Sequence, residues 1–574
     1  MKVNKIFKTA ALVLCSAVLF SGCIKEVLPK AGSITQEQLE DSGAGLEYMM
    51  KSIPAYMAAS TAMSYDHSDF GYHSIGAWMD HHALIMFPCT RSDRGGNPYY
   101  CRFQAANYGF DMSMNGGYTH YLWYNYYPFI KKANEVIAAT IDDEGNVIEE
   151  MEEFRAISKA FRALFYLDLA RYYDALPAKA PEIPTYEGDL AKVQGLTVPI
   201  VTEATTEESA KNNPRATREE LFEFILADLA DAEAVMKLYE TDPETGAKGK
   251  KAEVYGTTAT YPELAAVYGL YARAYLWLGG FNENYKNVPT GQKAYRLAAK
   301  YARLAIETSN APITSESEWT SVTSAFNTVT ASWLWATMLS SDTVLNNLFA
   351  FVAHMCPEAT YGYAPLACQG VSSKMYDRLN AGDIRKKLIV GPDTSYDEFK
   401  PYTSMSRDEW EELAYRAPYT NFKFRPAMGE RVDYMAANAV SLPVMRVDEM
   451  YFIEMEATAQ SGDTATAQNL LYTFMANRDS GYFYLPTKDL VEEIIFQKSV
   501  EFWGEGIVLF DMKRLNMGVN TLDQNYPSGM LFESDGRLPW WNMPIPNAES
   551  SVNKAIQGHE GPDPSLGYES QDAI

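Results

Sequence analysis

The stretch EMEEFRAISKAFRALFYLDLARYY, residues 150–173, decides how the rest of this chain is interpreted. Bulky apolar residues recur in it every three or four positions, which is the period of one helix face; they are Phe154, Ile157, Phe161, Leu164, Phe165, Leu169 and Tyr172. A second stripe of small residues comprises Ala156, Ala160, Ala163 and Ala170. Four glutamates between positions 149 and 153 crowd its start, where the helix dipole favours negative charge. These features predict a helix that is buried on two sides, at the core of an all-α protein.

The composition of the 574-residue chain is that of a folded protein, with 47% hydrophobic and 13% aromatic residues. Its formal net charge is −25. This charge argues against nucleic acid and other anionic polymers as ligands, because contacts to phosphate need clustered Lys and Arg. A neutral or cationic ligand fits better, although a large net charge often serves solubility alone.

Residues 1–22 have the features of a signal peptide, with lysines at the start followed by an apolar run that is too short for a transmembrane helix. The run ends in LFSGC, residues 19–23, which is similar to the lipobox of bacterial lipoproteins. We therefore expect cleavage before Cys23, lipid on its thiol, and a tether over residues 23–34 that attaches the protein to a membrane. An ordinary secretory leader that ends in a chance cysteine is the alternative.

Four cysteines follow the leader and the lipidated position, namely Cys89, Cys101, Cys356 and Cys368. In an exported protein they suggest disulfides, and four cysteines allow three pairings. The two local pairs, Cys89–Cys101 and Cys356–Cys368, are the simplest prediction. Free buried thiols are the alternative.

Further helices are predicted on both sides of the opening stretch, and several of them form pairs. Residues 261–279 and 293–307 have the Ala, Tyr and Leu spacing of a tetratricopeptide repeat, and 445–461 with 464–478 forms another pair. Such pairs stack into a superhelical scaffold. Two loop-rich blocks, about 60–117 and 310–435, interrupt the pattern, and long loops are often functional. Because no clean linker is visible, we predict a single domain over residues 35–574.

Several motifs in this order resemble the SusD/RagB family of outer-membrane nutrient-binding lipoproteins of Bacteroidetes. They are Trp123, Tyr127, Ile130 and Asn134 of a W-x-x-x-Y-x-x-I-x-x-x-N pattern, then FRALFYLDLARYYDALP, MYDRLNAGDIRKKL, VMRVDEMYFIEMEATAQSG, IIFQKSVEFWGEGIVLFDMKRL and LPWWNMPIPNAE. The resemblance covers nearly all of the chain after the leader. A departure is Asp174, where the family motif has glycine.

The resemblance implies a SusD-like fold and a lipoprotein of the outer membrane that faces the cell exterior. Members of the family cap a TonB-dependent β-barrel transporter, bind oligosaccharides or in some cases peptides, and help to pass them to the barrel. They perform no chemistry and carry no cofactor. Their tetratricopeptide-like helices mostly face the transporter, and the ligand lies on the loop-rich side.

Candidate ligand contacts are therefore sought in the two loop-rich blocks, because sugars present apolar C–H faces that flat aromatic rings bind. The candidates are Trp78, Asp80, His81, Arg91, Asn97, Tyr99, Tyr100, Trp319, Tyr361 and Tyr363. For any one aromatic residue, packing beneath a loop is the alternative. Trp123, Trp333, Trp335 and Trp503 lie in periodic segments and are predicted to be core, while Trp540 and Trp541 are predicted to anchor the tail.

Metal binding and catalysis are the remaining classes of function. His and Asp residues are dense between positions 66 and 82, but their spacing matches no metal motif, so we expect no metal. The sequence contains no G-x-S-x-G, H-E-x-x-H or phosphate loop, so we expect no enzyme. Composition alone leaves a glycosidase carboxylate pair open. A peptide-binding protein and a transporter lid with little ligand affinity are the closer alternatives to a glycan-binding protein.

Overall fold

The computed structural model of the chain describes residues 43–58, 71–90, 117–178, 186–238, 259–342, 344, 350–362, 364–365, 367–416, 418–484, 489–522, 524–526, 531 and 533–564. The chain divides into a unit of residues 1–48 and a unit of residues 49–574, and the second contains nearly all of the described structure. Within the described ranges, none of the helices combines the length and the apolar character needed to cross a bilayer.

Helices dominate the described residues. In the first half of the chain they are α3 (Gly43–Ala58), α4 (Gly71–His82), α6 (Gly117–Ala139), α7 (Glu152–Tyr173), α8 (Tyr186–Val193), α9 (Glu207–Ala210), α10 (Arg218–Lys237) and α11 (Leu264–Gly279). Then follow α12 (Gly291–Ser309), α13 (Glu316–Thr320), α14 (Phe351–Met355), α15 (Ser373–Arg378), α16 (Tyr396–Phe399), α17 (Arg407–Arg416) and α18 (Tyr434–Ala437). The last are α19 (Val447–Gln460), α20 (Thr464–Met475), α21 (Leu490–Glu501), α22 (Val508–Arg514) and α23 (Asn547–Val552).

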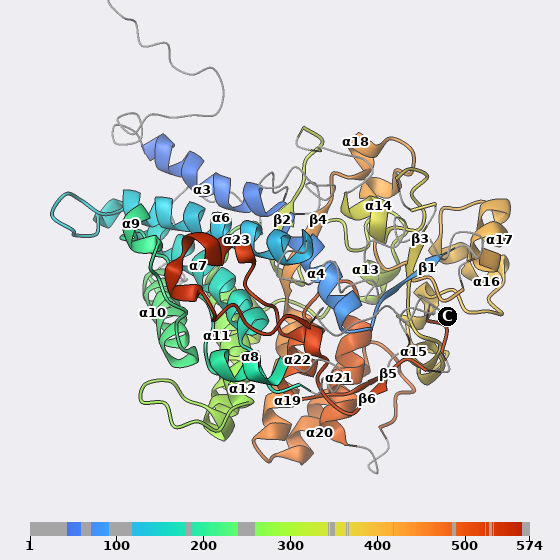
Figure 1. Cartoon of the computed structure of the whole chain (residues 1–574). Coiled ribbons are helices and arrows are strands. Elements are labelled where there is room, and N and C mark those ends of the chain that lie inside the picture. Colours follow the sequence, from blue (N-terminus) through green and yellow to red (C-terminus); the bar gives the residue numbers. More distant parts are fainter. Residues whose placement is uncertain are drawn as a thin grey trace, which may run out of the picture. The chain divides into compact units, whose positions relative to one another are not determined.

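The long helices form a series in which each packs against the next: α6 on α7, α7 on α10, α10 on α11, α11 on α12, α12 on α19 and α19 on α20. Figure 1 shows this series running down the left side and along the bottom of the molecule, with the short helices α13 to α18 on the other side. The predicted all-α fold, with tetratricopeptide-like helix pairs and large loop-rich insertions, is confirmed by this arrangement.

Helix α7 is buried on all sides, as its two stripes predict. Every residue from Glu152 to Tyr173 is buried except Glu152 and Arg155. The buried Arg162 on α7 donates to both carboxylate oxygens of Asp228 on α10 at 2.7 and 2.8 Å, and to Oδ1 of Asn134 on α6 at 2.7 Å. This one side chain therefore ties the central helix to both of its neighbours.

Asp174, the departure from the family motif, has a structural role at the end of α7. Its buried carboxylate accepts hydrogen bonds from Nε and Nη2 of Arg218 at 2.6 and 2.9 Å. Arg218 is the first residue of α10, whose start is fixed by a capping box between Thr217 and Glu220. The aspartate thus locks the end of one scaffold helix to the beginning of the next.

Short strands accompany the helices in three two-stranded antiparallel sheets. Their strands are β1 (Phe87–Thr90) with β3 (Ala367–Gly370), β2 (Trp333–Met338) with β4 (Ser441–Arg446), and β5 (Val519–Asn520) with β6 (Glu533–Ser534). Residues 445 and 446, which were expected in a helix, end strand β4 instead, and α19 begins at Val447. Trp333 and Trp335 are buried on β2, so their predicted place in the core is confirmed.

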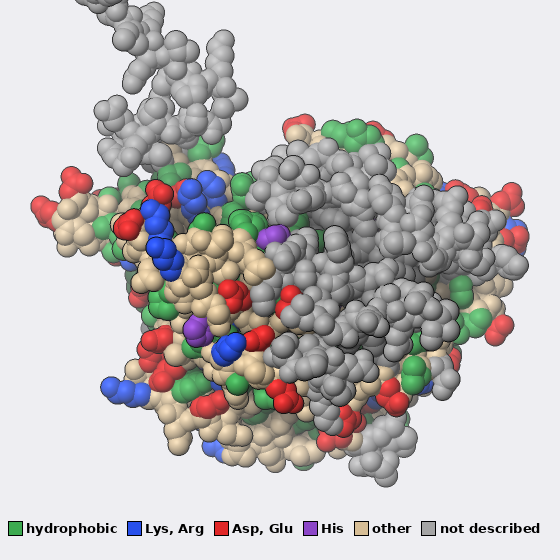
Figure 2. Space-filling view, in the orientation of Figure 1, with side chains coloured by type: hydrophobic (Ala, Val, Ile, Leu, Met, Phe, Trp, Pro, Cys, Tyr) green, Lys and Arg blue, Asp and Glu red, His purple; other side chains and the backbone are tan. Residues whose placement is uncertain are grey.

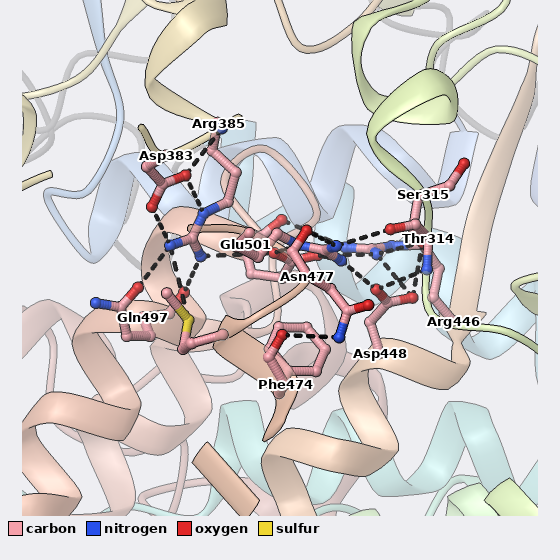
Figure 3. A network of polar contacts seen from close by, with 12 residues as sticks. Thr314, Ser315, Asp383, Arg385, Arg446, Asp448, Phe474, Asn477, Gln497 and Glu501 are labelled. Carbon is pink, nitrogen blue, oxygen red and sulfur yellow. Dashed lines mark hydrogen bonds and ion pairs between the residues drawn. The ribbon is translucent and has the colours of Figure 1, made fainter. Parts of the chain in front are cut away.

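A buried network of charges joins the scaffold to the loop-rich side (Figure 3). Arg478 donates to Asp448 at 2.6 Å and to Glu501 at 2.8 and 2.9 Å, and Arg446 lies 3.2 Å from Asp448. Arg385, which is paired with Asp383, lies 3.5 Å from Glu501. Burial alone would raise the pKa of Glu501, but Arg478, Arg446 and Arg385 outweigh it and hold this pKa well below its ordinary value.

Candidate functional site

The three candidates on α4 are buried and do not form a ligand surface. Trp78, Asp80 and His81 are 8%, 0% and 1% exposed. The Trp78 ring packs edge-on against Tyr121 at 4.8 Å. In this structure the three side chains lie in the interior, because α4 packs between the scaffold and the turn that follows α21.

Asp80 has a clear structural task. Its Oδ2 accepts hydrogen bonds from the backbone N–H of Gly504 at 2.6 Å and of Gly506 at 3.2 Å. Burial raises the pKa of Asp80 to about 8, although these two N–H groups and Lys423 act in the opposite direction. Gly506 packs directly on Gly76 of α4, leaving no space for a Cβ atom. The carboxyl group thus clamps α4 onto the 504–506 turn.

Among the candidates of the second block, Trp319 is also buried. It is 2% exposed and packs against Phe326 at 4.8 Å, with the Lys423 ammonium 5.3 Å from its ring. In this structure Trp319 therefore packs beneath a loop, the alternative given for each aromatic candidate. The remaining candidates Arg91, Asn97, Tyr99, Tyr100 and Tyr363 lie outside the described residues, as does Cys23.

Neither local disulfide is present in the structure. Cys89 and Cys356 are buried free thiols, which contradicts the pairings Cys89–Cys101 and Cys356–Cys368. The reason is the β1–β3 sheet, which places Cys89 opposite Cys368, a residue distant in sequence. Cys101 lies outside the described residues.

Tyr361 is the one described candidate that reaches the surface, and it lies beside a cluster of exposed apolar side chains. These are Met428, Val432, Tyr434 and Met435, which are 77%, 72%, 38% and 36% exposed. The Tyr361 and Tyr434 rings lie 6.4 Å apart at an angle of 60°. We call these five residues the Tyr434 surface. Figure 2 shows hydrophobic side chains at the top of the molecule, where Figure 1 places α18.

The backbone beneath the Tyr434 surface is held by buried charges. Arg425 donates to Glu358 at 2.5 Å, with both side chains almost fully buried. Arg431 donates to the carbonyl oxygen of Glu358 at 2.8 Å and to the carboxylate of Glu409 on α17 at 2.7 Å. Because Arg425 and Arg431 are both anchored, the backbone between them and directly after them is held rigidly.

Met428 has an unusual backbone at the centre of this segment. Its φ of 54° and ψ of 16° lie in the left-handed region, inside the short 3-10 helix η6 (Ala427–Gly429). A non-glycine residue costs free energy in this conformation, and such strain is concentrated at functional sites. The strained and exposed methionine marks this segment as a candidate binding surface.

Polar groups lie next to the aromatic pair. The Tyr361 hydroxyl donates to Oδ1 of the buried Asn438 at 2.6 Å. Within the described part of the chain, Nδ2 of Asn438 donates to no acceptor. Glu430 and the exposed Asp433 precede Tyr434 in the sequence. The surface therefore combines aromatic faces and flexible apolar side chains with carboxylates, and the Asn438 amide lies buried beneath it.

Two cavities lie elsewhere, inside the scaffold, and are too small for a ligand. One, of about 20 Å³, is lined by residues that include Tyr72, Tyr126, Asp168 and Arg171, and the other is about 10 Å³. Each has space for no more than one or two water molecules. In the described ranges, no group of three or more His, Cys, Asp or Glu side chains is arranged to hold a metal ion.

The residues of the Tyr434 surface other than Tyr361 were missed from the sequence. Met428, Val432, Tyr434 and Met435 occur in AMGERVDYM, where glycine and charged residues interrupt any period. Their one signal was their position near the end of the second loop-rich block. Trp540 and Trp541 were correctly assigned to the tail, since both indole N–H groups donate to the carbonyl oxygen of His82, at 3.2 and 2.8 Å.

The known proteins that this chain resembles were found by comparing its structure with solved structures. No protein-family model matches the chain, and no curated protein matches its sequence. A SusD-like carbohydrate binding protein from Bacteroides vulgatus matches with a TM-score of 0.64 and 19% identity, covering 90% of this chain and 98% of its own. A SusD superfamily protein from Bacteroides thetaiotaomicron matches with a TM-score of 0.60 and 16% identity, covering 90% of this chain and 98% of its own. Another from Parabacteroides distasonis matches with a TM-score of 0.58 and 14% identity, covering 91% of this chain and 98% of its own. The chain therefore has the SusD-like fold.

Proposed function

We propose that this protein is a non-enzymatic lipoprotein of the outer cell surface that binds an oligosaccharide and delivers it to a partner TonB-dependent transporter. The observation that carries the proposal is the match, over 90% of the chain, to a structure described as a SusD-like carbohydrate binding protein. The LFSGC sequence ending at Cys23 supports the lipid anchor. The transporter partner is proposed from the same resemblance.

The Tyr434 surface provides the chemistry that such a ligand needs. The apolar C–H face of a sugar ring packs on an aromatic ring, and Tyr434 offers an exposed one. The neighbouring Tyr361 hydroxyl, which donates to the buried Asn438, can accept a hydrogen bond from a sugar hydroxyl. The rigid base formed by Arg425 and Arg431 reduces the entropy lost on binding.

Calorimetry of the purified protein with a panel of oligosaccharides tests the binding step. We expect affinity for at least one oligosaccharide, and expect Tyr434→Ala to weaken it about tenfold, or about 1.4 kcal/mol. Tyr124→Ala is the matched control, because Tyr124 on α6 is 40% exposed and Tyr434 is 38% exposed. Absence of affinity for every glycan would refute the proposal, and release of shorter sugars during incubation would show an enzyme instead.

Delivery and anchoring need separate measurements. Affinity purification from the native outer membrane should recover a β-barrel transporter, and deletion of the gene should slow growth on the bound glycan. Cys23→Ser should abolish labelling of the protein by a fatty-acid probe. If the transporter is recovered but no glycan binds, the protein is a lid with little ligand affinity of its own.

Peptide binding is the second candidate, and one observation favours it. Met428, Val432 and Met435 contribute more exposed apolar surface than the tyrosines do, and methionine adapts readily to varied apolar side chains. The same calorimetry with a panel of apolar peptides separates the candidates. Peptide affinity that is lost in Met428→Ala, without any glycan affinity, would establish this second function.

A further inference from the structure

The charge around the Tyr434 surface is negative and fixed. Oε1 of Glu430 accepts hydrogen bonds from the backbone N–H of Val432 at 2.8 Å and of Asp433 at 3.0 Å. Oδ1 of Asp433 accepts from the N–H of Met435 at 3.1 Å and caps the start of α18. Both carboxylates are thus held against the segment that carries Tyr434.

The positive charges of the same segment are already neutralised. Residues 425–438 contain two cations, Arg425 and Arg431, and no lysine. Arg425 is buried against Glu358, and Arg431 is paired with Glu409. Neither guanidinium can turn towards a ligand on the Tyr434 surface without breaking its ion pair. Within the described residues 425–438, a ligand on this surface therefore meets two carboxylates and no unpaired cation.

From this arrangement we infer that the Tyr434 surface selects glycans by charge: it accepts neutral or amine-bearing sugars and rejects uronic acids and sulfated sugars. This inference rests on the proposed glycan-binding function and adds the class of sugar. An anionic group placed about 6 Å from Glu430 or Asp433, at an effective dielectric constant between about 20 and 80, would weaken binding by roughly tenfold.

A matched pair of ligands tests the inference. The tightest neutral oligosaccharide among maltohexaose, cellohexaose and mannohexaose is compared with the same oligosaccharide after oxidation of its primary alcohols to carboxylates. In 20 mM NaCl we expect the neutral form to bind at least about tenfold more tightly. The preference should shrink in 0.5 M NaCl, because salt screens exposed charges.

The double variant Glu430→Gln with Asp433→Asn removes both charges but keeps the oxygen atoms that accept the backbone N–H groups. We expect it to reduce the preference for the neutral over the oxidised ligand to within about twofold, whatever its affinity for the neutral ligand. Asp143→Asn with Glu144→Gln is the matched control, because it removes two exposed carboxylates from the turn between α6 and α7. The control should keep the full preference.

Four results separate the failures. If the oxidised ligand binds as tightly as the neutral one in 20 mM NaCl, the inference is wrong while glycan binding stands. If the double variant keeps the full preference for the neutral oligosaccharide, these two carboxylates do not select the ligand and the inference is wrong. The inference is also wrong if Tyr434→Ala binds the neutral oligosaccharide as tightly as the unchanged protein does. If no glycan of either charge binds, the proposed function fails and the inference fails with it.

Discussion

Glu501→Gln should destabilise the fold strongly, because Glu501 lies at the centre of the buried charge network. Its carboxylate accepts two hydrogen bonds from Arg478, at 2.8 and 2.9 Å, and lies 3.3 Å from Arg446 and 3.5 Å from Arg385. Its side chain is 0% exposed. Glutamine keeps the size but removes the charge that these three buried guanidinium groups share.

The expected cost is about 3–5 kcal/mol, the usual cost of removing one partner from a buried ion pair. Unfolding entropy of about 2.1 cal/mol/K per residue, over the unit of residues 49–574, converts each kcal/mol into roughly 1 °C. Differential scanning calorimetry should therefore show a fall in Tm of roughly 3–5 °C. Glu430→Gln, which removes a carboxylate at the surface, is the control and should leave Tm unchanged.

The difference between the two proteins should depend on pH. The pKa of Glu501 in the folded state is below its unfolded value, so its stabilising effect is complete above the unfolded pKa of about 4.3. The effect is lost as pH falls through the folded pKa, so the Tm difference should be constant from pH 6 to 8 and narrow under acid conditions. A Glu501→Gln variant that melts with the unchanged protein at pH 7 would refute the reasoning.

Three other substitutions test structural assignments. Asp80→Asn should flatten the pH profile of stability, because the pKa of Asp80 in the folded state is raised to about 8. The contribution of its carboxyl group to the free energy of unfolding is complete below about pH 4 and is lost as pH rises through 8. Urea unfolding from pH 4 to 9 measures this profile. Gly506→Ala should lower Tm sharply, since its φ is +76° and a Cβ would lie 2.1 Å from Gly76; Gly462→Ala, with open space but φ +96°, is the milder comparison. Trp319→Ala should cost about 3–5 kcal/mol of stability in the same urea assay, and a surface-like loss below about 1 kcal/mol would contradict its burial.

Local patterns in the sequence were sufficient for the scaffold. The period of α7 is encoded within a few residues, and the helix formed where predicted. The β1–β3 pair could not be foreseen, because each strand has four residues and its partner lies far away in the chain. The burial of Trp78 and Trp319 could not be foreseen either, since burial in an aperiodic segment is decided by what packs over it.

Several charged residues of the motifs that resemble the family are buried, which limits what these motifs reveal about the ligand. Within these motifs, buried Arg446 pairs with both Glu501 and Glu505, and Glu456 pairs with Arg514 at 2.5 Å. Their shared pattern therefore reports how the scaffold is joined to the loop-rich side. The Tyr434 surface lies outside every motif, so a relative with the same scaffold can present a different surface there. What a structural neighbour binds is accordingly no guide to the ligand of this chain, and substitutions within residues 425–438 test what the Tyr434 surface selects.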